Sequence, residues 1–179
     1  MRWIWIDRII ELEPGRRLVA VKNVSLAEDT IHNHFPADAA IGAKALPVMP
    51  APLIIEGMAQ AAGILVGHAR DFREKVILAK IGKAALAADA PPGVTLRYTA
   101  EIQHLDEMGA GTSGLVEMLN HGVDDGFREI GRIDLVFSHV DRNLAGTMFP
   151  EHNFVFTESF ETLLRSSGVR NADLTSAGR

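Results

Sequence analysis

The sequence contains no cysteine, so disulfide bonds and thiolate metal sites are excluded. It has no excess of basic residues either, and its net charge of −5 at pH 7 argues against a nucleic-acid-binding protein. It shows no internal repeat. About half of its 179 residues are apolar, which is ordinary for a globular protein with a sizeable core. This length favours one domain with an appended tail.

Long hydrophobic segments are missing as well. The apolar start of the chain, residues 1–6, ends at Asp7 and Arg8 and no small-residue cleavage site follows, so we expect no secretory signal. The longest apolar run, residues 51–66, is interrupted by Glu56 and is shorter than the ~20 residues of a membrane-spanning helix. We therefore expect a soluble, cytoplasmic protein that binds neither nucleic acid nor a membrane.

Strand patterns dominate the chain outside one helix. The clearest alternation of apolar and polar residues, at 94–103, predicts a half-buried strand of an antiparallel sheet. The glycines at 109, 111 and 114 predict a turn or bulge, and residues 37–46 predict a loop or a short irregular helix. Further strands are expected at residues 17–26, 76–81, 115–119 and 133–137, with turns at 13–16, 91–93 and 121–126.

Residues 53–68 predict one long helix. Pro50 and Pro52 suit its first turn, where a missing N–H costs nothing. Apolar residues point all round it, which predicts a helix buried on every side. A sheet wrapped around this central helix gives an α+β fold, and a second copy of the chain would cover the face that the sheet leaves open.

The C-terminal part, residues 145–179, is predicted to be an extension of a first domain that spans residues 1–144. Gly168 suits the end of a helix there, and residues 171–179 are expected to be disordered. One stripe of a short amphipathic helix is formed by apolar residues at i, i+4, i+7 and i+8, namely Phe156, Phe160, Leu163 and Leu164.

Glu56 is the one carboxylate in the apolar helix, and burying a charge is costly unless the charge is paired or neutralised. His34 lies upstream, beside proline-rich turns. An imidazole and a carboxylic acid in one apolar slot suit the elimination of water from a β-hydroxyacyl compound. His34 would remove the α-proton, and Glu56 would protonate the departing hydroxyl. The backbone N–H of Ala51, at the start of the helix, would stabilise the enolate oxygen.

Three motifs follow one another through this region. They are His34-Phe35-Pro36, Pro47-Val48-Met49-Pro50 and Glu56-x-Met58-Ala59-Gln60-Ala61-Ala62-Gly63. Together they resemble the pattern H-F-P-G-x-P-V-M-P-G-V-L-x-x-E-A-M-A-Q-A-A-G of the FabZ-type (3R)-hydroxyacyl-[acyl-carrier-protein] dehydratases of bacterial fatty acid synthesis. The likeness covers roughly residues 3–138. The combination is highly specific, whereas any one tripeptide would be weak.

The resemblance implies a hot-dog fold and a homodimer that can assemble further into a trimer of dimers. It implies that His34 and Glu56 face each other across the dimer interface and act on a hydroxyacyl chain carried by acyl carrier protein, with no cofactor and no metal. The family's helix-start N–H falls on Ala51. A glutamate at position 56 resembles the branch that dehydrates without isomerising the double bond. Substrate-binding positions within the motifs are Phe35, Met49 and Gln60.

Two departures from the family pattern bear on this site. Ten residues separate Pro36 from Pro47 where the family has two, which is an insertion of eight between the catalytic elements. The insertion either bulges outward and changes substrate choice, or moves His34 and abolishes activity. Ala51 replaces a glycine but keeps its N–H, and Gly57 replaces an alanine.

Each assignment has a structural alternative. His34 could be a loop histidine with a structural hydrogen bond, and Glu56 a charge that reaches solvent. His32 and His34 form an H-x-H pair that could bind a metal ion if a third ligand existed. Gln60 could hydrogen-bond around the site or the interface, or its role could be purely structural. An acyl tunnel and plain core are both open for Met49, Met58 and Leu65.

Two rival functions also stay open. One is another enzyme on the same fold, a thioesterase or a dehydratase of CoA-linked or polyketide chains. The other is a non-catalytic acyl-binding subunit whose site the insertion has spoiled. A basic patch could steer an acidic carrier protein, or its members could be ordinary solvated charges: Arg70, Arg73, Lys75, Lys80 and Lys83.

Overall fold

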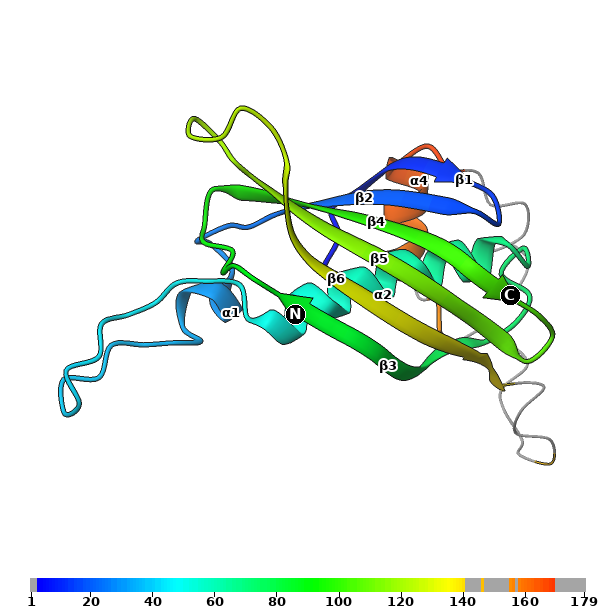
Figure 1. Cartoon of the computed structure of the whole chain (residues 1–179), viewed down its shortest axis with the longest axis horizontal. Helices are drawn as coiled ribbons and strands as arrows, with labels where there is room; N and C mark the ends of the chain where they lie inside the picture. The colour runs from blue at the N-terminus through cyan, green and yellow to red at the C-terminus, as the bar shows by residue number, and fades with distance from the viewer. Residues whose placement is uncertain (1–2, 141–145, 147–154, 157, 170–179) are drawn as a thin grey trace.

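The computed structural model describes residues 3–140, 146, 155–156 and 158–169 (Figure 1). Within these residues, antiparallel strands form one six-stranded sheet in the order β1-β2-β4-β5-β6-β3. The strands are β1 (Arg8–Glu13), β2 (Arg17–Asn23), β3 (Val76–Leu86), β4 (Val94–Leu105), β5 (Gly109–Asn120) and β6 (Arg128–His139). The helices are α1 (Asp29–His32), α2 (Ala51–His68) and α4 (Glu158–Ser166). In this described part of the chain, no helix combines the length and hydrophobicity that crossing a bilayer requires.

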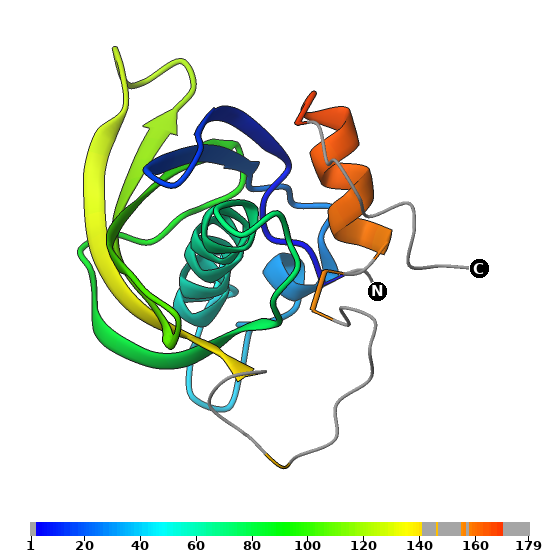
Figure 2. The same ribbon diagram turned by 90° about the vertical axis from the view of Figure 1, so that its right-hand side faces the viewer.

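The sheet curls around α2, which lies along its concave side (Figure 2). Met58, Ile64 and Leu65 of α2 are fully buried, and the inward-facing Leu96 and Ile133 of the sheet belong to the same core. Burial of a long apolar helix in this way contributes roughly 25 cal/mol for each Å² of apolar surface removed from water. The predicted α+β arrangement is confirmed.

The start of α2 follows from its prolines. Pro50 is the N-cap in an extended conformation, with ψ of 136°, and a proline lies in the first turn. Within one chain α2 is buried except along one face, which is the face that a second copy of the chain was expected to cover. Leu53, Glu56 and Gly63 are only partly buried, and their spacing of three and seven residues places them on one stripe. One face of the helix is therefore open, and Glu56 lies on it.

The glycines at residues 109, 111 and 114 were expected to mark a turn or a bulge. They do not form a turn, because β5 begins at Gly109. The pairing of β4 with β5 does shift its register at Gly111, between Ile102 and His104, as at a β-bulge. A Cβ at Gly114 would lie 2.5 Å from Sδ of Met58, and one at Gly109 would lie 2.0 Å from the carbonyl oxygen of Phe137. Gly114 therefore allows α2 to approach the strand closely, and Gly109 allows β6 to do so.

Strand boundaries also differ from the predictions. β1 and α1 were not predicted, and β3 continues five residues beyond the expected end at Ile81. The extra length of β3 comes from its pairing with β6, which extends to the Leu86–Gly131 pair. Residues 82–86 carry little strand propensity of their own, so tertiary pairing decides their conformation.

Residues 33–46 form a projecting loop that stands away from the body of the molecule (Figure 1). Every residue in it is exposed. A small antiparallel bridge joins Asp38 to Ala43, and the Leu46 N–H donates to the Phe35 carbonyl over 3.0 Å. The predicted loop at residues 37–46 is confirmed, and the insertion bulges outward rather than packing on the core.

The C-terminal extension, residues 155–156 and 158–169, packs against the edge of the sheet at β1. The Ile9 N–H donates to Oγ of Ser167 over 3.0 Å, and Leu163 and Leu164 are buried. Gly168 has a φ of +74° just after α4, as expected for a helix end. Phe156 lies before the helix rather than on it, and residues 171–179 lie outside the described residues.

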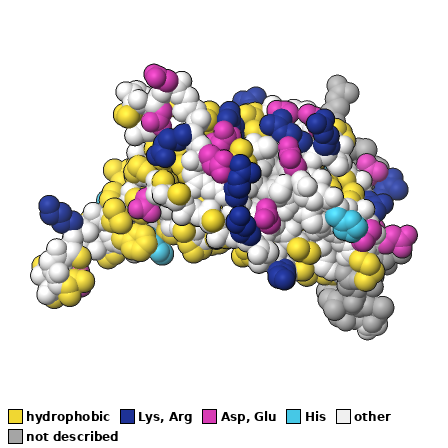
Figure 3. All heavy atoms as spheres, viewed as in Figure 1, with side chains coloured by type: hydrophobic (Ala, Val, Ile, Leu, Met, Phe, Trp, Pro, Cys, Tyr) yellow, Lys and Arg dark blue, Asp and Glu magenta, His cyan; other side chains and the backbone are white. Residues whose placement is uncertain are grey.

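The outer face of the sheet carries Lys and Arg side chains interspersed with Asp and Glu (Figure 3). Arg97 on β4 donates two hydrogen bonds to Glu117 on β5, at 2.7 and 2.8 Å. Apolar side chains gather beside the projecting loop in the same view. The middle of the sheet thus faces solvent, as an antiparallel sheet with one buried face does.

Candidate active site

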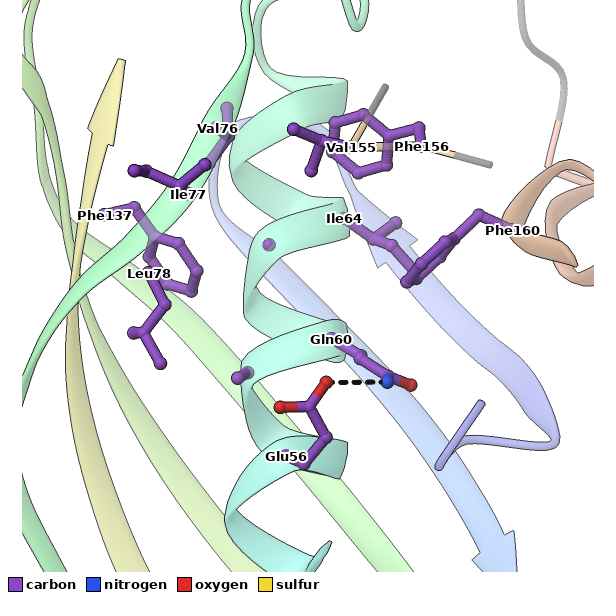
Figure 4. Close-up of a pocket in the computed structure, with 12 residues that line it drawn as sticks. Glu56, Gln60, Ile64, Val76, Ile77, Leu78, Phe137, Val155, Phe156 and Phe160 are labelled. Atoms are coloured by element: carbon purple, nitrogen blue, oxygen red, sulfur yellow. Dashed lines mark hydrogen bonds between the residues drawn. The ribbon is translucent and has the colours of Figure 1, made fainter. Parts of the chain in front are cut away.

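Glu56 lies in the second turn of α2 with its carboxyl group turned toward the open face. Its Oε1 accepts a hydrogen bond from Gln60 Nε2 at 2.9 Å (Figure 4). The same oxygen accepts another from Trp3 Nε1 at 3.2 Å. Both donors reach the same oxygen, so neither of these two bonds occupies Oε2. These two bonds orient the carboxyl group of Glu56.

Gln60 ties the N-terminal segment to α2. Its Oε1 accepts from the Trp5 N–H at 2.8 Å, and its Nε2 also donates to the Trp3 carbonyl at 3.2 Å. Only 6% of Gln60 is exposed, so these bonds form in a largely water-free place. Gln60 therefore holds both Glu56 and the two tryptophans in position.

A cavity of about 280 Å³ extends from Glu56 along the open face of α2 (Figure 4). On one side it is bounded by β3 and β6, and on the other by the C-terminal extension. Glu56 and Gln60 are its only polar side chains among the described residues, and both lie at one end. Its other lining residues are Ala59, Gly63, Ile64, Val76, Ile77, Leu78, Phe137, Val155, Phe156 and Phe160.

Ala51 is the first residue of α2 and is exposed. The first four N–H groups of a helix have no partner within it, and they form the positive end of the helix dipole. Ala51 and the buried Met49 line a second cavity of about 300 Å³, together with Ile54 and residues 86–89. The structure thus places these two predicted site residues beside each other, in a space separate from the cavity that contains Glu56.

His34 lies in the projecting loop and lines neither cavity. Its ring packs edge-on against Phe35, with ring centroids 4.5 Å apart, and Phe35 is itself 42% exposed. His34 and His32 belong to no group of three or more potential metal ligands among the described residues. A single chain therefore does not bring His34 and Phe35 into the cavity of Glu56.

Sequence reasoning missed several residues that surround Glu56. Trp3 donates to the carboxyl from 53 positions away, and Phe137, Phe156 and Phe160 line its cavity. No local periodicity marks such contacts, because they depend on how distant segments meet. Met58 and Leu65, which were open between tunnel and core, are fully buried core residues.

The five cations that were open between a basic patch and ordinary solvated charges differ in exposure. Lys75 is buried, with 7% exposed, and Arg70 donates to the Asp106 carbonyl at 3.3 Å. Lys80 and Lys83 are exposed on β3, and Arg73 is exposed beyond the end of α2. Three of the five cations are thus exposed to solvent.

One antiparallel sheet wrapped around a long central helix is the hot-dog fold. Two solved structures share it with a TM-score of 0.54. One is the dehydratase heterocomplex ApeI:P from Xenorhabdus doucetiae, 16% identical, with coverage of 80% of this chain and 90% of that chain. The other is smu.793 from Streptococcus mutans bound to acetyl-CoA, 9% identical, with coverage of 73% and 86%. At such low identity these likenesses establish the fold alone.

The family is narrower than the fold. The model of the FabA-like domain matches residues 3–122, so this chain belongs to the FabA-like family. The chain is 41% identical over 101 residues to the 3-hydroxyacyl-[acyl-carrier-protein] dehydratase FabZ of Symbiobacterium thermophilum. It matches the protein of the same name from Ruminiclostridium cellulolyticum equally well. Each match spans 56% of this chain and 66% of the relative's own length.

Proposed function

We propose that this protein dehydrates (3R)-3-hydroxyacyl thioesters to trans-2-enoyl thioesters, acting in the cytoplasm on chains carried by acyl carrier protein. The observation that carries the proposal is the carboxyl of Glu56, oriented by Trp3 and Gln60 at the polar end of an otherwise apolar cavity. Membership of the FabA-like family and the names of the FabZ relatives support the same reaction.

The proposed reaction needs a base, an acid and a donor to the thioester oxygen. The His34 imidazole removes the α-proton, and the N–H of Ala51 stabilises the negative charge that develops on the thioester oxygen. The bond from Cβ to oxygen then breaks, the double bond forms, and Oε2 of Glu56 gives its proton to the departing hydroxyl, which leaves as water. Return of the proton from the imidazolium to the Glu56 carboxylate, through water, restores both groups.

A homodimer would bring these groups together. β3 is an edge strand, and Ile77, Leu78 and Ile81 on it are 37–45% exposed. The open face of α2 carries Glu56 next to this edge. Apolar exposed edges of this kind are covered in stable proteins, and a two-fold axis here would let each projecting loop reach the other protomer. We propose that one protomer's His34 serves the other protomer's Glu56.

The reaction is tested with the full chain and a (3R)-hydroxyacyl thioester, following the absorbance of the enoyl product. We expect turnover in the wild type and near-complete loss in His34→Ala, with the dimer preserved in light scattering, which also separates a dimer from a trimer of dimers. Full activity in His34→Ala would overturn the mechanism. Release of free acid instead of enoyl thioester would identify a thioesterase.

Mixed dimers test whether the site spans two chains. His34→Ala and Glu56→Gln are each expected to be inactive, yet co-expression should restore about a quarter of the wild-type activity. Half of the dimers are then mixed, and each mixed dimer has one complete site out of two. No recovery would show that both groups act within one chain.

A further inference from the structure

We propose that the C-terminal extension sets the length of the acyl chain that the cavity accepts, through Val155, Phe156 and Phe160. This inference rests on the proposed function for the nature of the ligand. The family model ends at residue 122, so the three side chains lie outside the matched region. They nevertheless line the same cavity as Glu56.

The cavity has a chemical direction. Its polar side chains, Glu56 and Gln60, lie at one end, and apolar side chains continue along α2 past Ile64 (Figure 4). Glu56 and Ile64 are eight residues apart, which is about 12 Å along a helix. A thioester whose β-carbon lies at Glu56 would extend its hydrocarbon tail in this direction, since that is where the apolar lining is.

The extension stands at the side and far end of this path. Figure 4 shows Phe160 level with Ile64, and Val155 with Phe156 beyond it, opposite the side chains of β3. A tail that passes Ile64 therefore meets these side chains. Their removal would lengthen or widen the space, and added bulk would shorten it.

Phe156 packs against α2 at Gly67, where the missing side chain leaves room for its ring. A Cβ at Gly67 would lie 2.5 Å from Cζ of Phe156 and 2.9 Å from the ring of Phe72, so only glycine leaves room for both rings. The Phe156 ring packs edge-on against Phe72 at 4.8 Å and against Phe160 at 5.9 Å. Only 5% of Phe156 is exposed. The far wall is thus a packed part of the domain and can resist an entering chain.

The opposite wall of the cavity, on β3, is less suited to limit the length of the acyl chain. Ile77 and Leu78 lie on the exposed edge strand β3, and both are more than a third exposed. In the proposed dimer their positions depend on the second copy. The extension belongs to the same chain as the cavity, so it is the wall that this sequence adds for itself.

The test measures the binding of saturated acyl N-acetylcysteamine thioesters, from butyryl to palmitoyl, to the full chain by calorimetry. Phe160→Ala should raise the affinity for long chains relative to medium ones by roughly tenfold, and Val155→Phe should lower it by a similar factor, since one methylene in an apolar pocket is worth at least about that much. Phe127→Ala is the matched control, because its ring packs under Arg97 at 4.1 Å and does not line the cavity.

Unchanged length profiles in both Phe160→Ala and Val155→Phe would overturn the proposal, as would an equal change in Phe127→Ala. If Phe160→Ala loosens the extension, Val155→Phe decides, because it adds bulk to the wall instead of removing it. Turnover of hydroxyacyl thioesters is measured in parallel. If the binding profiles shift but no turnover is found, the extension controls chain length and the proposed dehydration is wrong. If turnover is found but the profiles do not shift, only the proposed role of the extension is wrong.

Discussion

The two regions that carry the predicted catalytic groups differ in how the chain holds them. Glu56 lies on a packed helix, and two hydrogen bonds fix its carboxyl. His34 lies in an exposed loop whose backbone bonds to the rest of the chain are at its two ends, from Asn33 to Asp29 and from Val48 to Leu46. The single chain therefore positions the acid, and the position of the base depends on what the projecting loop meets.

The largest effect is expected from the substitution that removes the proposed acid, Glu56, and leaves its surroundings intact. Glu56→Gln keeps an oxygen that can accept from Trp3 and Gln60, but its amide has no acidic proton to transfer to the leaving hydroxyl. We expect turnover to fall by about 10²–10⁴-fold, the usual contribution of general acid catalysis. The unfolding midpoint should stay within about 2 °C of the wild type. Glu101→Gln, an exposed carboxylate on β4, is the control, and substantial activity in Glu56→Gln would contradict the acid role.

The projecting loop is tested at its tip. Ile41 is 77% exposed, and in the proposed dimer it contacts the second protomer. Ile41→Ser should weaken the dimer by roughly tenfold in sedimentation, because burial of a large aliphatic side chain is worth about 1.5–3 kcal/mol. Val123→Ser is a matched control, since Val123 is 74% exposed in the turn between β5 and β6. Equal dimer affinity in both variants would place the loop outside the interface.

The orientation of Glu56 can be loosened without touching the carboxyl. Trp3→Phe removes the N–H that donates to Oε1 and keeps a ring beside Trp5. We expect kcat to fall by roughly tenfold, as for one hydrogen bond to a charged or reacting group, with little change in KM. Trp5→Phe makes the same change where Nε1 has no partner in the described structure, so its kcat should stay close to wild type. Equal effects would indicate a merely structural role for Trp3.

The packing of α2 differs at two of its glycines, so we expect a change to alanine to have opposite effects on the free energy of unfolding at the two positions. A Cβ at Gly57 would lie 2.6 Å from Oη of Tyr98, a hydroxyl whose pKa is raised by burial, and 2.9 Å from the Trp5 carbonyl. Gly57→Ala should therefore cost about 1–3 kcal/mol of the free energy of unfolding. At Gly63 the nearest atom is 3.5 Å away, so Gly63→Ala should stabilise by up to about 1 kcal/mol. Chemical denaturation of both variants measures the difference.

The smallest effect is expected in the short loop between β4 and β5, which hydrogen bonds to Asp106 hold in place. The Asp106 carboxylate, between β4 and β5, accepts from the Met108 and Gly109 N–H groups and from His104, and the Met108 bond is the main cause that lowers its pKa. A lowered folded-state pKa contributes stability above the ordinary value near 3.8, which is lost as the pH falls through the lowered pKa. Asp106→Asn should thus unfold at a slightly lower temperature than wild type at pH 7, and the gap should close in strong acid. A gap independent of pH would assign the effect to loop packing.

Local pattern was sufficient for much of the fold. The alternation at residues 94–103 lies within β4, and the prolines at 50 and 52 mark the start of α2 to within two residues. Local pattern failed where the conformation of a residue depends on contacts with distant parts of the chain. Gly109 and Gly114 are strand residues because β6 and α2 press against them, and Leu86 is in a strand because β6 pairs with it.

The sequence by itself determined the family, the central helix and the one carboxylate that the helix carries, because these follow from a linear motif and from hydrophobic periodicity. Only the tertiary structure decided what surrounds that carboxylate. It brought Trp3 to Glu56, seated Phe156 against Gly67 and directed the insertion away from the body. Such contacts join residues more than fifty positions apart and are selected by shape and hydrogen-bond geometry, which no local pattern in the chain records.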